Sequence, residues 1–274
     1  MEILLKSSSV HMKHPEIVNK KLHKIINDGI EQLMFISDFD YTLSCYKDSN
    51  GNLASNTPQL IRHMVLDKHS ELEDMYNEMV KKFHAIEICP LMSNEEKIPY
   101  MVEWWTKSQQ YAIKAGLSKL DIKEKVALSN LNLSAGFGDV VKFLFENKMG
   151  NIPGNLHIVS NMMIFDAQDN CVNFSKPIIH SFNKNSSVIS NDHTFIPDIE
   201  GRSNVFLLGD SLGDPHMDVG IKGESTALKI GFLNMNFETY LNKYLDLYDI
   251  VIVDDQTMEI PLKIFEYILS QRNN

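Results

Sequence analysis

Apolar runs of strand length alternate with amphipathic helical patterns in this chain. A helical pattern over 15–30 precedes the run Leu33 to Ile36. Similar, mostly apolar runs occupy 204–208, 227–233 and 249–253. Continuous apolar runs of this length are typical of strands that are buried on both faces of a parallel sheet. An amphipathic pattern over 260–269 predicts a last helix that covers one face. The sequence therefore predicts an α/β fold with a parallel sheet.

A long helical insert separates the first predicted strand from the others. Helical periodicity begins at Thr57-Pro58 and continues to about Leu128. After the insert, 156–160 predicts a short strand and 165–174 predicts a hairpin around Asp169-Asn170. We expect residues 1–50 and 129–274 to form the core and residues 51–128 to form a helical cap inserted into it.

Composition narrows the class of protein. The chain has 274 residues, of which 43% are hydrophobic, enough for one sizeable core with an inserted cap. A net charge of −10 argues against nucleic acid as a partner. Three cysteines without metal-ligand spacing favour free thiols in a reducing compartment. Because we find neither a signal-peptide core nor a membrane-spanning apolar run, we expect a cytoplasmic protein without a membrane partner, and a monomer.

The first predicted strand ends in two acidic residues. Asp38 and Asp40 form an Asp-x-Asp-x-Thr pattern directly after the apolar run. Residues two apart in an extended segment point the same way, and open α/β sheets bind their ligands at the carboxyl ends of the strands. One carboxylate could attack phosphorus while the other handles protons. The alternative for the pattern in isolation is a solvated acidic turn.

A second acidic loop follows the run 204–208 and favours the chemical interpretation. Its sequence is Gly209-Asp210-Ser211-Leu212-Gly213-Asp214. Mg²⁺ takes oxygen ligands and retains several waters. We therefore expect a magnesium site formed by Asp38, the Asp40 backbone carbonyl and Asp210, with Asp214 in a supporting role.

Two further positions suit a phosphate group. Ser134 and Ala135 precede a helical pattern that begins near Asp139, and a helix N-terminus with a nearby hydroxyl attracts anions. Lys184 offers a point charge for the same phosphate. The alternatives are that Ser134 is only a helix N-cap and that Lys184 is an ordinary exposed lysine.

In this order the motifs resemble the haloacid dehalogenase superfamily of aspartate-nucleophile phosphatases, and within it the cytosolic 5′-nucleotidase III family. The resemblance runs from about the first helix to Leu269. The motifs that carry it are, in family order, residues 38–44, 85–87, 95–97, 99–108, 134–136, 159–161, 182–184, 208–211 and 228–234.

The resemblance implies a fold, a substrate and a set of roles. It implies a Rossmann-like core with a mostly helical cap, and a pyrimidine or 7-methylguanosine 5′-monophosphate bound between them. Glu87 would contact the base and Ser108 would help to position the nucleotide. By its pattern alone, Glu87 ends a helix and could equally be a solvated surface acid.

One departure from the family concerns the segment before Ser134. Relatives carry a helix and an apolar strand there, about 20 residues with the connecting turn, whereas here Ser129 to Leu133 leads directly into the loop. Leu131 to Leu133 could replace the strand in shortened form. The leading hypothesis is a Mg²⁺-dependent 5′-nucleotidase. The alternatives are a phosphatase of another small phosphoester and an inactive nucleotide-binding variant.

Overall fold

The computed structural model describes residues 7–89, 91–128, 137–185, 199–220 and 225–271, which form two compact units. The first unit comprises Met1–Ala54 with Lys184–Asn274, and the second comprises Ser55–Asn183. The second unit thus includes residues 138–183, which the sequence analysis assigned to the core. The division of roles between a catalytic core and a specificity cap stays a prediction.

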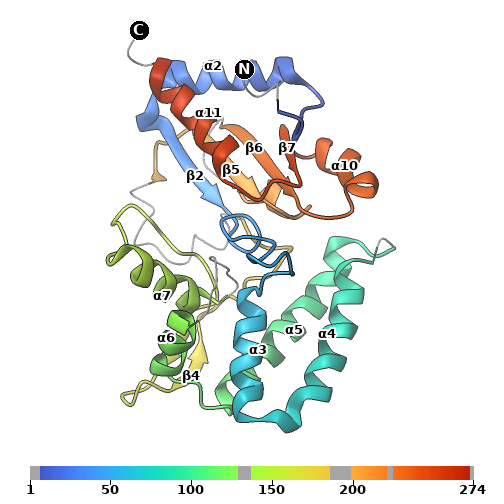
Figure 1. Ribbon diagram of the computed structural model, residues 1–274, viewed down its shortest axis with the longest axis vertical. Helices are drawn as coiled ribbons and strands as arrows, with labels where there is room; N and C mark the ends of the chain where they lie inside the picture. The colour runs from blue at the N-terminus through green and yellow to red at the C-terminus, as the bar shows by residue number, and fades with distance from the viewer. Residues whose placement is uncertain (1–6, 90, 129–136, 186–198, 221–224, 272–274) are drawn as a thin grey trace. The chain divides into compact units, whose positions relative to one another are not determined.

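The first unit contains a five-stranded sheet in the order β1-β7-β6-β5-β2 (Figure 1). The strands are β1 (Val10–His11), β2 (Leu33–Ser37), β5 (Asn204–Gly209), β6 (Thr226–Leu233) and β7 (Ile250–Val253). β2, β5, β6 and β7 run parallel, and β1 pairs with β7 in the antiparallel sense. The predicted α/β fold with a parallel sheet is confirmed. The short antiparallel strand β1 was not predicted.

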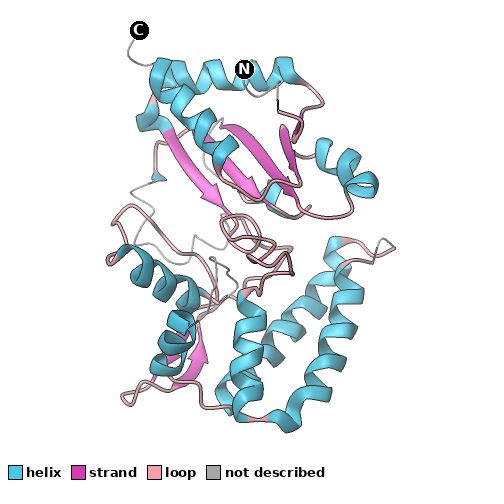
Figure 2. Cartoon of the chain, in the orientation of Figure 1, coloured by secondary structure: helices cyan, strands magenta, loops and turns pink. Residues whose placement is uncertain are grey.

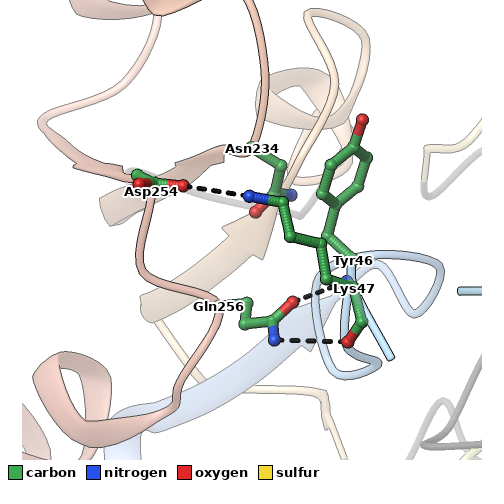
Figure 3. A pocket seen from close by; sticks show the side chains of 5 residues that line it. All are labelled: Tyr46, Lys47, Asn234, Asp254 and Gln256. Atoms are coloured by element: carbon green, nitrogen blue, oxygen red, sulfur yellow. Dashed lines mark hydrogen bonds and ion pairs between the residues drawn. The ribbon is translucent and has the colours of Figure 1, made fainter. Parts of the chain in front are cut away.

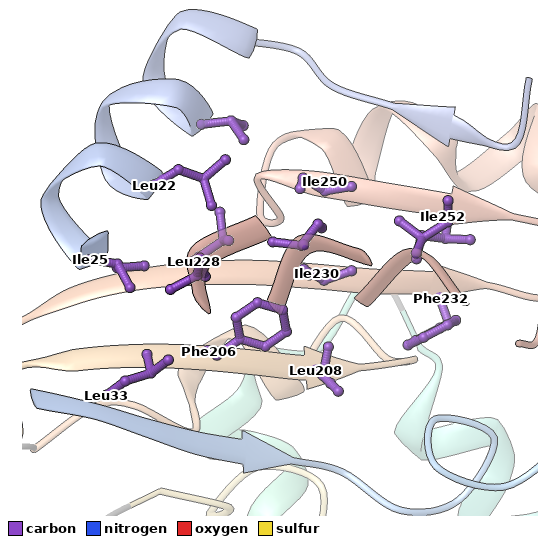
Figure 4. Packing of buried hydrophobic residues seen from close by; sticks show 14 residues of the cluster. Leu22, Ile25, Leu33, Phe206, Leu208, Leu228, Ile230, Phe232, Ile250 and Ile252 are labelled. Carbon is purple, nitrogen blue, oxygen red and sulfur yellow. The ribbon is translucent and has the colours of Figure 1, made fainter. Parts of the chain in front are cut away.

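Helices cover both faces of this sheet. They are α2 (Pro15–Asp28), α10 (Phe237–Leu245) and α11 (Glu259–Ser270), with short 3-10 turns η1 (Ile30–Gln32) and η3 (Asp214–His216). On one face, α2 and α11 pack on alternate strand residues such as Phe206 and Ile230 (Figure 4). On the other face, α10 packs on the intervening residues, such as Val205 and Leu207. Successive side chains of a strand point to opposite faces, so strands covered on both sides are apolar throughout.

β2 is the last strand in the sheet order, and the chain continues from it directly into Asp38 of the predicted site. It pairs with β5, and within the described ranges it has no second strand neighbour. Phe35, in the middle of β2, is 51% exposed, although its ring contacts Phe206 and Phe265. Leu131 to Leu133, the predicted replacement for a neighbouring strand, lie outside the described residues.

The second unit is mostly helical (Figure 2). Its elements are α3 (Thr57–Lys68), η2 (Ser70–Leu72), α4 (Glu73–Glu87), α5 (Asn94–Lys114), α6 (Lys119–Leu128), α7 (Gly138–Met149), β3 (Met163–Phe165) and β4 (Cys171–Phe174). A capping box begins α3 at Asn56 and α5 at Ser93, which satisfies free amides in the first turn of each helix.

Two predictions for the second unit have opposite outcomes. The hairpin is confirmed, because β3 and β4 pair and Asp169 adopts the left-handed conformation in the turn, with a φ of 62°. The strand predicted at 156–160 is wrong. Those residues form no ladder with the described part of the chain, where a single bridge joins Phe137 and Asn161 just beyond them. An apolar segment forms a strand only when it pairs with another strand, and the apolar pattern at 156–160 does not show whether such a partner exists.

Candidate active site

The two acidic loops start side by side because β2 and β5 are parallel and in register. Ser37 lies opposite Leu208, and the Asp38 amide continues the ladder by donating to the Leu208 carbonyl at 2.9 Å. Asp38 and Asp210 therefore emerge from the carboxyl ends of adjacent strands. This is the position at which open α/β sheets bind their ligands.

Three carboxylates converge at this edge of the sheet. One oxygen from each of Asp38, Asp210 and Asp214 lies within 4.8 Å of the others. Asp38 is 9% exposed and Asp214 is 1% exposed. Three acidic groups at this spacing, two of them shielded from water, need positive charge nearby.

Lys184 supplies one positive charge. Its Nζ atom lies 2.5 Å from Asp38 Oδ1 and 3.5 Å from Asp214 Oδ1. The Lys184 side chain is 34% exposed, whereas the Asp38 side chain that it contacts is 9% exposed. The predicted lysine therefore belongs to the carboxylate cluster, and the interpretation of Lys184 as an ordinary exposed lysine does not fit the structure.

Asp214 also holds the second acidic loop in shape. Its Oδ2 atom accepts hydrogen bonds from the amides of Asp210, at 3.1 Å, and Ser211, at 2.9 Å. Gly209 is required below it, since a Cβ there would come within 2.4 Å of the Asp214 Cβ atom. Asp214 thus orients the turn that carries Asp210.

Burial and mutual repulsion disfavour ionisation of the clustered carboxylates. Burial raises the pKa of Asp38 to about 6, the Asp214 charge adds to this shift, and Lys184 opposes it. Burial, followed by the charge of Asp38, raises the pKa of Asp210 well above its ordinary value. Burial alone would lower the pKa of Lys184, but the carboxylates of Asp38 and Asp214 outweigh it and raise this pKa. A divalent cation with oxygen ligands fits this donor set because it would favour the ionised carboxylates.

Asp40 lies within electrostatic range of the cluster. Among the causes of the raised Asp210 pKa, after burial and nearer charges, is the charge of Asp40. The chain turns tightly here: the Phe39 carbonyl accepts from the Ser44 amide at 3.0 Å, and Tyr41 is left-handed with a φ of 59°. The Thr42 hydroxyl is buried and has no hydrogen-bond partner within the described part of the chain. A bound phosphate could satisfy such a group.

A small cavity lies farther along the same loop (Figure 3). Its volume is about 110 Å³, and it is lined by Tyr46, Lys47, Asn234, Asp254 and Gln256. The Gln256 side chain bonds both the amide and the carbonyl of Lys47, at 2.7 and 3.3 Å. None of the clustered carboxylates lines this cavity, so we do not regard it as the active site. The bonds from Gln256 to Lys47 stabilise the loop at this point.

The predicted base-contact residues lie in the second unit. Glu87 ends α4, and its carboxylate accepts a hydrogen bond from the Ser181 hydroxyl. Ser108, in α5, is buried and hydrogen-bonded to Tyr76, whose pKa burial raises to about 12. Glu87 is thus hydrogen-bonded to Ser181 and Ser108 to Tyr76, and their contacts with a nucleotide stay a prediction. Ser134 and Ala135 lie outside the described residues.

Two asparagines, which the sequence analysis did not single out for this role, fix the segment that leads to Lys184. The Asn161 side chain bonds both the amide and the carbonyl of Ile179, at 3.0 and 2.9 Å. The Asn183 side chain accepts from the His180 amide at 2.7 Å and donates to the Ile178 carbonyl at 2.8 Å. Both lie within motifs of the family resemblance, but only the fold shows that they shape the backbone beside Ser181.

Taken with the sheet order, the paired acidic loops and their lysine define an α/β protein of the haloacid dehalogenase-like class. The family model for pyrimidine 5′-nucleotidase (UMPH-1) matches residues 41–133 and 124–269. The chain belongs to this family.

Similar proteins are named either as cytosolic 5′-nucleotidases or as 7-methylguanosine phosphate-specific 5′-nucleotidases. A Caenorhabditis elegans protein, provisionally named cytosolic 5′-nucleotidase 3, is 37% identical over 293 aligned residues, covering 98% of this chain and 78% of its own. A human 7-methylguanosine phosphate-specific 5′-nucleotidase is 33% identical, covering 97% and 95% of the two chains. The crystal structure of cytosolic 5′-nucleotidase IIIB bound to cytidine has a TM-score of 0.87 and 28% identity, covering 98% of this chain and 96% of its own.

Two features of these comparisons bear on the segment before Ser134. The alignment with the Caenorhabditis elegans protein is 293 residues long, more than the 274 residues of this chain, so the relative has residues without a counterpart here. The family model matches in two pieces that overlap at 124–133, and this overlap includes the predicted departure at 129–133.

None of the described helices is long and apolar enough to cross a membrane.

Proposed function

We propose that this protein is a Mg²⁺-dependent 5′-nucleotidase that hydrolyses pyrimidine nucleoside 5′-monophosphates, 7-methylguanosine 5′-monophosphate, or both. The observation that carries the proposal is the contact of Lys184 with Asp38 beside Asp210 and Asp214. Family membership and the names of the relatives support the substrate class. A cytosolic location is part of the proposal and agrees with the name of the Caenorhabditis elegans relative.

Asp38 is the nucleophile in this proposal. A carboxylate oxygen of Asp38 attacks phosphorus, the bond from phosphorus to the 5′-oxygen breaks, and Asp40 gives a proton to the departing nucleoside. Asp40 then takes a proton from water, which attacks the aspartyl-phosphate and releases inorganic phosphate. Asp38 is thereby regenerated.

Positive charge balances the phosphate during both steps. The Lys184 ammonium, already 2.5 Å from Asp38, attracts the equatorial phosphate oxygens. We expect Ser134 and Ala135 to add hydrogen bonds. Asp38, the Asp40 backbone carbonyl and Asp210 would hold Mg²⁺, with Asp214 in support. When bound, Mg²⁺ supplies charge stabilisation of the phosphoryl group.

Glu87 is the proposed contact to the base. Its carboxylate can accept from an exocyclic amine of cytosine or attract a cationic 7-methylguanine ring. The hydrogen bond from Ser181 fixes one side of this carboxylate at the end of α4. Ser108 is proposed to position the nucleotide from α5.

A nucleotide-binding protein without turnover is the second candidate. The observation that favours it is that β2, which carries Asp38 at its end, pairs with one strand only among the described residues. A poorly supported nucleophile loop would bind substrate but position Asp38 badly. A phosphatase of another small phosphoester would use the same cluster without the base contact.

One assay separates these candidates. Purified protein is incubated with CMP, UMP, 7-methyl-GMP and p-nitrophenyl phosphate, with Mg²⁺ or with a chelator, and phosphate release is measured. A 5′-nucleotidase prefers at least one nucleotide and loses activity in the chelator. Preference for p-nitrophenyl phosphate would support the general phosphatase, and nucleotide binding without release would support the inactive variant.

A further inference from the structure

The turn that carries Asp210 is held from below by two tyrosines. Tyr244, in α10, donates from its hydroxyl to the Asp210 carbonyl at 2.5 Å. Tyr248, just after α10, donates to the Ser211 carbonyl at 2.6 Å. Both side chains are buried, at 8% and 3% exposure, and a buried carbonyl without a partner is costly.

These two bonds complete the restraint of the turn. The Asp214 carboxylate already accepts from the amides of Asp210 and Ser211. The amide and the carbonyl of both residues are therefore bound to side chains, so rotation of the peptide groups around Asp210 would break one or more bonds. Because the backbone sets the direction of the Cα–Cβ bond, this arrangement fixes the direction in which the Asp210 side chain leaves the turn.

The sheet leaves room for the second tyrosine. Gly209 of β5 and Gly231 of β6 lie opposite each other in the parallel ladder. A Cβ on Gly231 would come within 2.7 Å of the Tyr248 ring, and one on Gly209 within 2.8 Å of its hydroxyl. The rings of Tyr244 and Tyr248 stack with their centroids 5.6 Å apart, so the two hydroxyls are placed as a unit.

The far end of the loop has its own anchor. The Lys229 Nζ atom, from β6, donates to the Pro215 carbonyl at 2.5 Å and to the Asp218 carboxylate at 2.9 Å. Lys229 thus holds residues 215–218, whereas the two tyrosines contact the turn at Asp210 and Ser211.

We propose that Tyr244 and Tyr248 are positioning residues that orient Asp210 for binding of the divalent cation. This inference rests on the proposed Mg²⁺-dependent function and adds residues to it. Neither tyrosine is assigned contact with substrate; both act through the backbone of the Asp210 turn.

The test compares Tyr244→Phe, Tyr248→Phe and the double variant with a matched control, Tyr240→Phe. Tyr240 lies on the same helix, and its ring contacts Lys243. Mg²⁺ affinity is measured by calorimetric titration of the full chain, alongside the Mg²⁺ dependence of CMP hydrolysis and the melting temperature. We expect roughly tenfold weaker Mg²⁺ binding in the double variant, equivalent to about 1.4 kcal/mol. The KM for CMP at high Mg²⁺ should change much less, and Tyr240→Phe should match the wild type.

Gly231→Ala provides an independent variant, since it crowds the Tyr248 ring and keeps both hydroxyls. It should also weaken Mg²⁺ binding. Lower melting temperatures with unchanged Mg²⁺ affinity in all tyrosine variants would overturn the positioning role and leave the magnesium site intact. A wild-type chain that binds no Mg²⁺ would overturn the metal proposal and this inference together.

Discussion

Lys184 and Asp38 are 146 positions apart in the chain, yet the Lys184 Nζ atom lies 2.5 Å from Asp38 Oδ1. The same ammonium is 3.5 Å from Asp214. This contact places the positive charge on the carboxylate that we propose as the nucleophile. An incoming phosphate would meet a preorganised charge, which is more effective than one that must reorganise during the reaction.

Removing that charge should reduce turnover strongly. We expect Lys184→Met to lower kcat for CMP by roughly 10²–10³-fold, the usual cost of losing one preorganised electrostatic contact. Lys176→Met is the matched control, because Lys176 is exposed in the same part of the sequence. Rates of the two variants within a few-fold of each other would contradict a catalytic role for Lys184.

The Glu87 assignment predicts a change in substrate preference. Glu87→Gln should weaken CMP or 7-methyl-GMP hydrolysis by about 1.5–3 kcal/mol in kcat/KM, the typical value of hydrogen bonds to charged groups. Hydrolysis of p-nitrophenyl phosphate should change much less, because that substrate has no base. Ser181→Ala should shift preference in the same direction, since Ser181 donates to Glu87.

Glu78→Gln, an exposed position on the same helix, is the control for this pair. Equal losses on nucleotides and on p-nitrophenyl phosphate would contradict a base contact and make Glu87 a structural residue.

Asp139 should make stability depend on pH. It is buried at the start of α7, where burial raises its pKa although the Met163 amide donates to it at 2.5 Å. With a raised pKa, the folded state binds the proton more tightly than the unfolded state, so this residue lowers stability as pH rises above the ordinary carboxyl range.

Asp139→Asn cannot ionise, and its amide oxygen can still accept from Met163. The stability of the variant relative to the wild type should therefore increase as pH rises from the ordinary carboxyl range towards neutral. Melting temperatures across that range test this expectation. A constant difference between the two proteins at every pH would contradict it.

Among the described residues β2 pairs with β5 alone, and this predicts that the chain gains from a restored segment. A helix and strand of family type, inserted between Asn130 and Ser134, should raise the melting temperature and the nucleotidase rate. Each unpaired buried backbone group costs roughly 1–3 kcal/mol, and 1 kcal/mol corresponds to about 2–4 °C in a protein of this size. Equal melting temperature and equal rate in both proteins would show that the segment is dispensable, or that Leu131 to Leu133 already replaces the strand.

The sheet could be predicted because its strands are buried on both faces and therefore appear as unbroken apolar runs, as at 204–208. The hairpin could be predicted because Asp169-Asn170 suits a left-handed turn. A strand at 156–160 was predicted on apolar residues alone and is wrong, because strand formation needs a partner that local sequence does not show.

The acidic motifs at Asp38 and Asp210 could be identified because each directly follows a strand. The bond from Ser181 to Glu87 could not, since 94 positions separate the two residues and neither has a distinctive local pattern. Tyr244, in α10, and Tyr248, just after it, likewise have no local pattern that points to Asp210. Their hydroxyl bonds to the Asp210 turn depend on how that helix packs on the sheet.

The most direct test of the account is phosphate release from CMP and 7-methyl-GMP by the purified chain and by Asp38→Asn, both with Mg²⁺. Asn occupies the same volume but cannot accept the phosphoryl group. We predict clear, Mg²⁺-dependent release by the wild type and release at background by Asp38→Asn, with both proteins folded as judged by melting. Release well above background by folded Asp38→Asn would contradict the assignment of Asp38 as the nucleophile.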